Sequence, residues 1–381
     1  MTKKEEPGKL SIEQIRRMIN KKIGSEVAHS LKNENPSDVK DWIPTGSRWL
    51  DGIICRGKLA GIPVGKITTM SGFEGTGKSY LAAKIAANAQ KKGIVVVYFD
   101  SESALDSNFL KNAGCNLNSL IYQQATSLED VLETIEMLMT SAEERFLFIL
   151  DSLANTPTKS DIAGDFNPNA SIALSARIMS KGFKKLTVPL ASHQSTFLIL
   201  NQLKMRIATS PFEANAIKSD PYAESGGKSH LYSSSLHIVL TGRKADNAFI
   251  KDENGYVIGS EVKAKLKKSR FGTLRRECIF DIIWGNDDVA VRDEESWLTA
   301  ILPSDKLQVN GSWYEIEGFK KFQPGKWMEM LEDEKFKKKV LDIFDEQVIQ
   351  KFHDRTGTAE SYYGTDDEEN GEETIEKNDN G

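Results

Sequence analysis

One short segment carries residue types that together bind a triphosphate. Gly72 to Ser79 reads GFEGTGKS, a full match to the pattern GxxxxGK[ST]. Its glycines let backbone N–H groups turn toward phosphates, Lys78 neutralises the terminal phosphates, and the Ser79 hydroxyl faces Mg²⁺. We therefore expect ATP and Mg²⁺ to bind here; the segment with its following residue comprises Gly72, Phe73, Glu74, Gly75, Thr76, Gly77, Lys78, Ser79 and Tyr80.

The alternative to a real phosphate loop is a chance match. A working loop needs a strand before it and a helix after it. The apolar Ile67–Met70 predicts the strand, and the alanine-rich Tyr80–Ala89 predicts the helix. The context therefore favours the functional interpretation.

Acidic residues end two apolar segments further along the chain. Asp151 follows Phe146–Leu150 and fits the acid that orients Mg²⁺ opposite a phosphate loop, with contact expected through water. Asp100 and Glu102 follow Ile94–Phe99, and ligands gather at the carboxyl edge of open α/β sheets. One of these carboxylates can polarise the attacking water, although two ordinary surface acids at a strand end are the alternative.

The apolar segments that precede these residues indicate a parallel sheet. Continuous apolar strands with helical patterns between them are typical of a sheet covered on both faces. We expect an α/β fold of this kind with a half-exposed, lysine-lined strand at Glu261–Lys267 and a small α/β appendage over residues 295–352. The expected strands also include Phe197–Leu200 and Leu236–Leu240.

Charge is distributed unevenly along the chain. Residues 366–381 hold eight acids and one lysine, a net −7 within a total of −5, so residues 1–365 sum to +2. Such a terminal segment cannot bury apolar area, and we expect a disordered acidic tail. It either aids solubility or competes with a polyanion for the protein's own basic surface. The sequence leaves both open.

Other compositional features exclude whole classes of site. The three cysteines form no CxxC pair and the five histidines form no spaced cluster, so we expect a reduced protein without metal apart from nucleotide-bound Mg²⁺. No segment approaches the roughly 18 apolar residues that a membrane span needs, and the start lacks an apolar leader. We expect a cytoplasmic protein, in a bacterium or a phage-infected host, with no membrane partner.

An amphipathic helix is expected at the amino end. Leu10–Leu31 places isoleucines three and four residues apart, with lysines and arginines opposite. Its apolar face packs either on its own domain or on a neighbouring protomer. The sequence alone does not decide between these.

Several segments, in the same order along the chain, resemble the RecA family of recombinases. Within this family the chain is most similar to the bacterial RecA proteins and the phage UvsX-type proteins. The resemblance covers about residues 42–330. The segments are Tyr98–Asp106, Ile172–Ser180, Leu200–Ile207, Glu224–Lys228, Gly259–Arg270 and Gly311–Tyr314.

The resemblance implies roles for single residues. Glu102 matches the glutamate that activates water, and Gln202 matches the glutamine that senses the γ-phosphate. Asp106 and Phe109 fall where the family contacts adenine. Lys268 and Arg270 match basic residues that reach the ATP of an adjacent protomer, with Arg270 standing where bacterial RecA has lysine. A lysine-rich exposed strand is the alternative for these two.

The same resemblance implies that two segments, 161–172 and 203–225, hold DNA. Phosphates would meet Lys204 and Arg206, while Ile172 and Ile207 would wedge between bases. A flexible substrate lid is the physical alternative for the longer segment. The remaining expected DNA residues are Arg177, Met205, Gly226 and Gly227.

These observations predict a RecA-type phosphate-loop ATPase that forms filaments on single-stranded DNA and exchanges strands with homologous duplex. Single-strand-binding and loader proteins are expected partners. A hexameric helicase, a recombination accessory protein and a small-molecule kinase are the rival functions. The expected organisation is an oligomerisation helix and linker at 1–40, the ATPase core at 41–290, a small domain at 291–355 and the acidic tail at 356–381.

Overall fold

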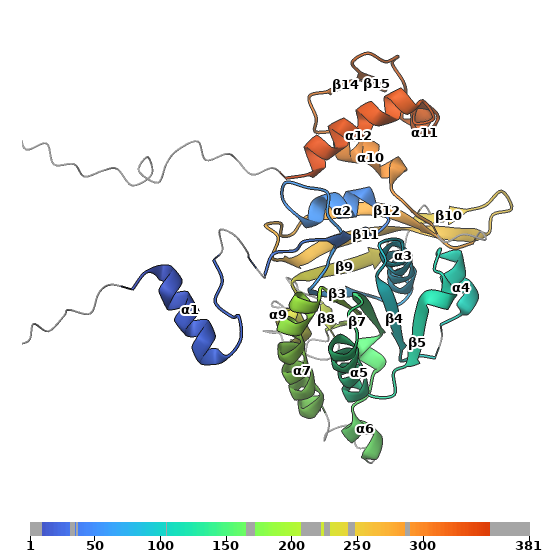
Figure 1. Cartoon of the computed structure of the whole chain (residues 1–381). Helices are drawn as coiled ribbons and strands as arrows, with labels where there is room; N and C mark the ends of the chain where they lie inside the picture. Colours follow the sequence, from blue (N-terminus) through green and yellow to red (C-terminus); the bar gives the residue numbers. More distant parts are fainter. Residues whose placement is uncertain are drawn as a thin grey trace, which may run out of the picture. The chain divides into compact units, whose positions relative to one another are not determined.

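The computed structural model describes residues 10–30, 35, 37–103, 105–164, 172–206, 222–224, 229–242, 248–285 and 290–350, the side chains of 172–175 and 229 excepted. Figure 1 shows the arrangement of the elements. The helices are α1 (Ile12–Ile23), α2 (Arg48–Ile54), α3 (Lys78–Lys91), α4 (Ser107–Asn112), α5 (Leu128–Ser141), α6 (Lys159–Ala163), α7 (Ile172–His193), α9 (Ser229–Ser233), α10 (Glu294–Ile301), α11 (Trp327–Met330) and α12 (Glu334–Val348).

Most strands belong to one large sheet. Within the described residues it has 11 strands, ordered β13-β12-β11-β9-β3-β7-β6-β4-β5, with β10 pairing with β11 and β8 with β7. Those strands are β3 (Ile67–Gly72), β4 (Val95–Asp100), β5 (Leu120–Gln124), β6 (Phe146–Asp151), β7 (Thr196–Met205), β8 (Tyr222–Glu224), β9 (Leu236–Gly242), β10 (Phe249–Lys251), β11 (Val257–Ser269), β12 (Glu277–Ile283) and β13 (Ala290–Arg292). Two small two-stranded sheets pair β1 (Trp42–Ile43) with β2 (Ile62–Pro63) and β14 (Leu307–Asn310) with β15 (Trp313–Ile316).

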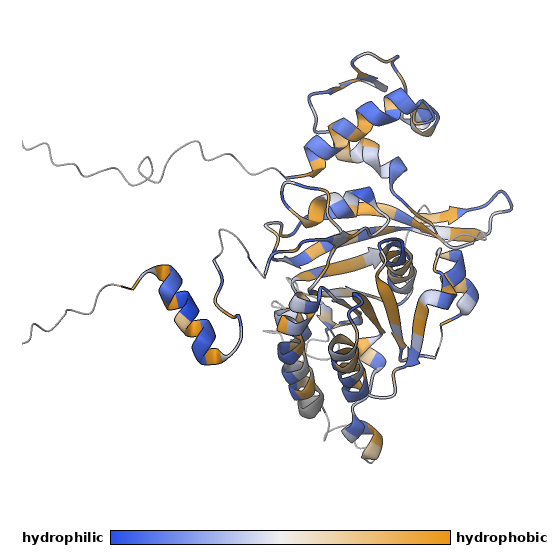
Figure 2. Ribbon diagram, in the orientation of Figure 1, coloured by the Kyte–Doolittle hydropathy of each residue, from blue (hydrophilic) through white to orange (hydrophobic). Residues whose placement is uncertain are grey.

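The middle of the sheet is parallel, which confirms the predicted fold class. Strands β9, β3, β7, β6, β4 and β5 run parallel to one another, whereas β11, β12 and β13 add an antiparallel edge next to β9. Because successive side chains of a strand point to opposite faces, Tyr98 and Ile149 pack in the core with α3, and Phe99 and Phe148 pack in the core with α5 and α7. Figure 2 shows these strands as the apolar centre of the molecule.

The register of the parallel strands aligns their carboxyl ends. Asp100 of β4 lies opposite Asp151 of β6, and Gly72 of β3 lies opposite Gln202 of β7. Residues from four segments of the chain therefore meet at one edge of the sheet, where the chemistry was expected.

The carboxyl-terminal elements share the core of the large sheet. Phe336 and Phe344 of α12 and Trp297 of α10 belong to the same buried cluster as α3. Arg48 of α2 donates two hydrogen bonds to the Asp345 carboxylate, at 2.9 and 2.5 Å. The domain boundaries at residues 40, 290 and 355 stay predictions, and the tail lies outside the described residues.

The amino-terminal helix is shorter than the sequence pattern predicts. α1 begins with a capping box at Ser11 and ends at Ile23, because Gly24 takes the left-handed conformation with φ of 76° and caps the helix. None of its residues is buried, and Ile12 is 87% exposed. Its apolar face therefore finds no cover among the described residues of its own chain.

Candidate nucleotide site and DNA-binding stem

The expected strand, loop and helix are all present around the phosphate-binding motif. β3 ends at Gly72, and α3 begins at Lys78 with Gly77 as its cap. Gly77 has φ of 79°, and a Cβ at this position would lie 2.4 Å from Ile282 Cδ1. Only glycine satisfies both conditions. The α3 amino terminus thus points its free backbone N–H groups at the loop, as an anion site requires.

Lys78 is held inside the loop rather than in solvent. Its ammonium donates hydrogen bonds to the carbonyls of Gly72 at 3.1 Å and Phe73 at 2.7 Å, and the residue is 9% exposed. Burial lowers the pKa of Lys78, while the charges of Asp151, Glu102 and Glu74 oppose that shift. A buried cation whose hydrogen bonds go to neutral carbonyls gains from the arrival of an anionic phosphate.

Asp151 lies at the acidic side of the cavity. Its Oδ2 accepts a 2.7 Å hydrogen bond from the Tyr98 hydroxyl, and the Ser79 hydroxyl also bonds to this carboxylate. Burial raises the pKa of Asp151 despite these bonds, and the nearby charges of Glu102 and Asp100 raise it further. The cluster therefore carries negative charge that a cation would relieve.

The donor set suits Mg²⁺. Ser79 and Asp151 supply the hard oxygen atoms that Mg²⁺ prefers, and this ion usually takes only one or two protein ligands beside phosphates and water. The described residues contain no cluster of three or more His, Cys, Asp or Glu that could hold a metal ion. Bound there, Mg²⁺ would neutralise phosphate charge.

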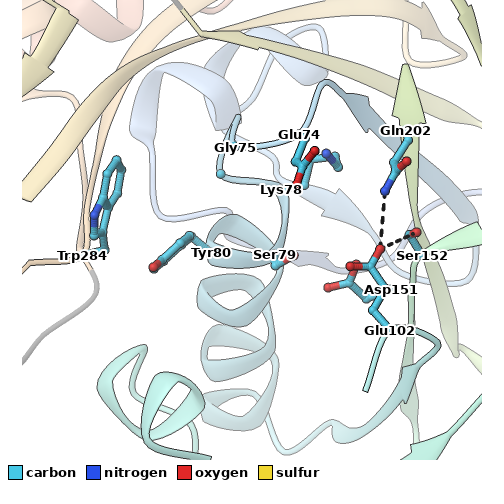
Figure 3. A pocket seen from close by; sticks show the side chains of 11 residues that line it. Glu74, Gly75, Lys78, Ser79, Tyr80, Glu102, Asp151, Ser152, Gln202 and Trp284 are labelled. Carbon is cyan, nitrogen blue, oxygen red and sulfur yellow. Dashed lines mark hydrogen bonds between the residues drawn. The ribbon is translucent and has the colours of Figure 1, made fainter. Parts of the chain in front are cut away.

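Glu102 is positioned by three donors. Its Oε1 accepts from Asn155 Nδ2 at 2.6 Å, Ser152 Oγ at 3.1 Å and Gln202 Nε2 at 3.4 Å. Figure 3 shows Glu102 with Ser152 and Gln202 at the wall of the cavity. Asp100 accepts from the backbone N–H of Glu102 at 2.9 Å and so holds the turn that carries it.

An aromatic group lines the other end of the cavity. Tyr80 contacts Phe109 edge to face, with ring centroids 4.8 Å apart, and Trp284 at 5.6 Å. The cavity of about 300 Å³ includes Tyr80 and Trp284, and an adjoining space of about 380 Å³ includes Asp106 and Phe109. Asp106 itself caps α4 through Asn108 N–H at 2.9 Å. Flat apolar rings beside a phosphate loop can accommodate a base.

The second expected DNA segment has an ordered stem. Leu203, Lys204 and Met205 continue β7 and pair antiparallel with Glu224, Ala223 and Tyr222 of β8. The prediction of a loop from residue 203 is therefore wrong by three residues at its start, and it also missed β8, because strand pairing across a long separation leaves no local pattern. Similarly, α6 occupies residues 159–163, so the first segment begins helical rather than irregular.

The structure describes some of the other predicted DNA-contact residues in full, one in part and some not at all. Lys204, Met205 and Arg206 are exposed at the end of β7, and Arg177 is exposed on α7. Ile172 begins α7, but its side chain is outside the described residues, as are Ile207, Gly226 and Gly227 altogether.

Comparison with known proteins places the chain in a family. The RecA N-terminal domain family matches residues 10–288. The chain belongs to the RecA family. Protein RecA of Chlamydia caviae is 30% identical over 331 residues, covering 87% of this chain and 88% of the relative. Protein RecA of Bifidobacterium longum is 30% identical over 300 residues, covering 79% and 70%.

As a RecA-family protein, the chain is an ATP-dependent strand-exchange recombinase and a DNA-dependent ATPase that acts in recombination and repair. It binds DNA and self-associates. This assignment favours the recombinase over the ring helicase, the accessory protein and the metabolite kinase. Over the residues that can be described, no helix is long and apolar enough to cross a membrane.

Lys268 and Arg270 of this RecA-family chain do not line its own nucleotide cavity. Lys268 Nζ donates to the carbonyls of Leu231 at 2.6 Å and Tyr232 at 2.9 Å, and Arg270 Nη2 donates to the Tyr232 carbonyl at 3.4 Å. Burial, assisted by the Arg270 charge, lowers the pKa of Lys268 to about 8. Their action on a neighbouring protomer stays a prediction.

Sequence reasoning missed three residues of the site. Ser152 and Asn155 position Glu102, and Trp284 lies beside Tyr80. Ser152 follows Asp151 directly, so its place at the strand end was a usable signal. Asn155 and Trp284 carried none, since their place depends on a turn and on the distant strand β12.

Proposed function

We propose that ATP lies along the cavity from the aromatic group to the acidic edge. Its phosphates rest on Gly72, Phe73, Glu74, Gly75, Thr76 and Gly77, and its adenine on Tyr80, Phe109, Asp106 and Trp284. Lys78 leaves its loop carbonyls and pairs with the terminal phosphates. Ser79 and Asp151 hold Mg²⁺, with Asp151 acting through water. The buried ammonium of Lys78 and the uncompensated acids beside it support this assignment.

Glu102 orients and polarises the water that attacks the γ-phosphate. The observation that carries this proposal is the convergence of Asn155, Ser152 and Gln202 on one oxygen of its carboxylate. Three donors hold the group in one orientation, as general-base catalysis requires. Gln202 senses the γ-phosphate: when the phosphate competes for its amide, the 3.4 Å contact to Glu102 breaks and β7 transmits the change.

The β7 and β8 stem carries the DNA loop. Lys204 and Arg206 neutralise phosphates, with Met205, Arg177, Gly226 and Gly227 nearby in the contact surface, and Ile172 and Ile207 separate bases. The exposure of Lys204, Met205 and Arg206 at the end of a buried strand supports this role. Contacts to the DNA phosphate backbone make binding insensitive to the DNA sequence and sensitive to salt.

Protomers assemble into helical filaments on single-stranded DNA and pair it with homologous duplex. The uncovered apolar face of α1 docks on a neighbouring protomer, and Lys268 and Arg270 reach that neighbour's ATP. Single-strand-binding and loader proteins assist assembly, in the cytoplasm of a bacterium or a phage-infected host. The exposed isoleucines of α1 support the docking, because isolated apolar helices rarely remain uncovered.

One experiment tests the proposal as a whole. ATP hydrolysis is measured with and without single-stranded DNA, and the product with a non-hydrolysable analogue is imaged by electron microscopy. The proposal expects hydrolysis stimulated by DNA and extended helical filaments. Closed rings or DNA-independent hydrolysis would overturn the filament and sensing roles.

A further inference from the structure

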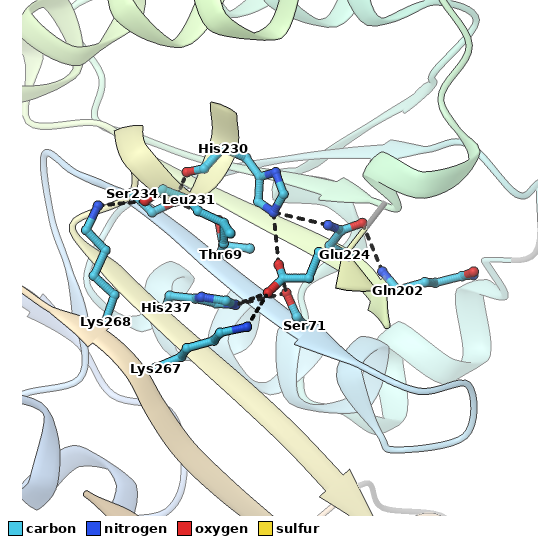
Figure 4. A network of polar contacts seen from close by, with 11 residues as sticks. Thr69, Ser71, Gln202, Glu224, His230, Leu231, Ser234, His237, Lys267 and Lys268 are labelled. Atoms are coloured by element: carbon cyan, nitrogen blue, oxygen red, sulfur yellow. Dashed lines mark hydrogen bonds and ion pairs between the residues drawn. The ribbon is translucent and has the colours of Figure 1, made fainter. Parts of the chain in front are cut away.

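A buried carboxylate lies at the base of the DNA-loop stem. The side chain of Glu224, the last residue of β8, is 3% exposed. Its Oε2 accepts from Ser71 Oγ at 2.8 Å and bonds to His230 Nε2 at 2.9 Å, and its Oε1 lies 3.3 Å from His237 Nε2. Lys267 Nζ is 3.5 Å from the same Oε1. Figure 4 shows these side chains converging on Glu224.

The partners of Glu224 belong to elements that the nucleotide site also uses. Ser71 on β3 directly precedes Gly72, the first residue of the phosphate loop. His230 Nε2 lies 3.2 Å from Asn201 Nδ2, and Asn201 Oδ1 accepts from the backbone N–H of Gln202 at 2.9 Å. The carboxylate is thus hydrogen-bonded to the strand entering the phosphate loop, and His230 contacts the residue next to the proposed γ-phosphate sensor.

A second contact joins the same two regions. The ring of Phe73, inside the phosphate loop, meets the ring of Tyr222 on β8 edge to face, with centroids 5.0 Å apart. Phe73 is two residues after Ser71, and Tyr222 is two residues before Glu224. The end of β3 and the whole of β8 therefore contact each other at two points, one polar and one apolar, in addition to the backbone pairing of β8 with β7.

The charges in this cluster are balanced by the protein itself. Although burial opposes ionisation, the hydrogen bonds from His230 and Ser71 hold the pKa of Glu224 below its usual value, at about 2. Burial lowers the pKa of His237 to about 4, so this imidazole is neutral at pH 7, and its Nε2 lies 3.0 Å from Ser71 Oγ. An ionised carboxylate buried among fixed donors keeps one geometry. Any shift of β3 that moves Ser71 must therefore act on β8.

We propose that Glu224 is a positioning residue that couples nucleotide occupancy to the DNA-binding arrangement of the second loop. It ties the carboxyl-terminal strand of the loop stem to the strand entering the phosphate loop, whereas Gln202 acts through the amino-terminal strand. The two strands of the stem then respond together. This inference rests on the proposed DNA role of the loop, and it adds a second route from the ATP site to that loop.

The test measures the coupling itself in the full chain. The affinity for fluorescent oligo-dT is determined without nucleotide and with a non-hydrolysable ATP analogue plus Mg²⁺, and the ratio of the two is the coupling factor. Glu224→Gln keeps the size of the side chain and removes its charge. We expect its coupling factor to fall about 10-fold, within the range typical of coupled sites. Analogue affinity and DNA-free hydrolysis should change less than about twofold.

A matched control separates coupling from general loss of a charge. Glu277→Gln removes a half-exposed carboxylate that pairs with Lys263 at 2.6 Å on β11, outside this cluster. Its coupling factor should equal that of the wild type. A lower melting temperature of Glu224→Gln with an unchanged coupling factor would overturn the inference and leave Glu224 a structural residue only.

A milder variant keeps the test decisive if Glu224→Gln does not fold. Ser71→Ala removes one donor to Glu224 and should lower the coupling factor by about half as much on a logarithmic scale. A folded Ser71→Ala protein with wild-type coupling would contradict the inference. If the wild type itself shows no rise in DNA affinity with nucleotide, the proposed function of the loop fails instead, so the two failures are distinguishable.

Discussion

Two buried carboxylates near the end of β3 have opposite electrostatics. Asp151 has a raised pKa because burial and two other acids disfavour its charge, and Tyr98 and Ser79 compensate only in part. Glu224 has a lowered pKa because histidine and serine donors outweigh its burial. The first site gains from the arrival of cations, whereas in the second the protein itself supplies hydrogen-bond partners to Oε2 and places the Lys267 ammonium 3.5 Å from Oε1. Binding sites and structural clusters differ in this way even within one sheet edge.

The strongest test of that comparison removes the lysine inside the nucleotide cavity. Lys78→Ala leaves the phosphates facing the acids without a cation, so hydrolysis should fall by at least about 100-fold. Steady-state hydrolysis with saturating DNA measures it. Lys91→Ala, an exposed lysine in the last turn of α3, is the control. Retained turnover would show that the loop does not bind the triphosphate.

Replacing Glu102 separates catalysis from binding at the nucleotide site. Glu102→Gln should still bind ATP and DNA but hydrolyse about 100-fold more slowly, because its amide cannot take a proton from water. Hydrolysis and nucleotide titration are measured on the same preparation. Glu277→Gln, which changes a carboxylate outside the cavity, should keep most activity. A collapse of ATP affinity in Glu102→Gln would contradict its assigned role.

Asp151 should respond to cations in a way that Glu224 does not. At about 100 times its dissociation constant, a Mg²⁺-nucleotide complex stabilises a protein by about 2.7 kcal/mol. We expect the free energy of unfolding to rise by about this amount in the wild type and by much less in Asp151→Asn. Thermal unfolding with and without the ligand measures the difference.

The ligand-free Asp151→Asn protein also tests the direction of the pKa shift of Asp151. A raised native pKa means that the stability contributed by Asp151 is full below its unfolded pKa and is lost as pH rises through the native pKa. The variant should therefore gain stability over the wild type as pH increases. A constant difference across pH would show that Asp151 is not electrostatically strained.

Glu224 should show the reverse dependence on pH. Its native pKa is lowered from 4.5 to about 2, so its contribution is full above the unfolded value and is lost as pH falls through that interval. Glu224→Gln should be about 1–3 kcal/mol less stable at pH 7, and the difference should narrow toward pH 3.5. Denaturant unfolding at several pH values measures it. A difference that widens in acid would contradict the assignment.

The smallest expected effect concerns the acidic tail. Deleting residues 366–381 removes a net −7 from the chain and should strengthen DNA binding a few-fold, mostly at low salt, since screening weakens long-range repulsion. Salt titrations of oligonucleotide affinity measure this change in DNA binding. The deletion leaves the Glu224 cluster unaltered. Equal affinity at every salt concentration would leave the tail with solubility alone.

The local parts of the site were predictable from short stretches of sequence. The phosphate loop between β3 and α3 and the acids at the ends of β4 and β6 lie where the patterns placed them, because each depends on contiguous residues. The end of α1 was missed, although Gly24 was a visible stop signal. The role of the lysine-lined strand as a bridge between β9 and β12 needed the full sheet order.

By itself, the sequence determined the chemistry of ATP binding, the alternation of strands and helices, and the family. Those properties follow from residue type and near neighbours, which a linear pattern records. Only the tertiary structure decided that Asn155 and Gln202 meet on Glu102, that Trp284 faces Tyr80, and that Glu224 is enclosed by Ser71, His237 and Lys267 of other strands. Such contacts arise from strand order and register, and these are set by burial of the whole sheet.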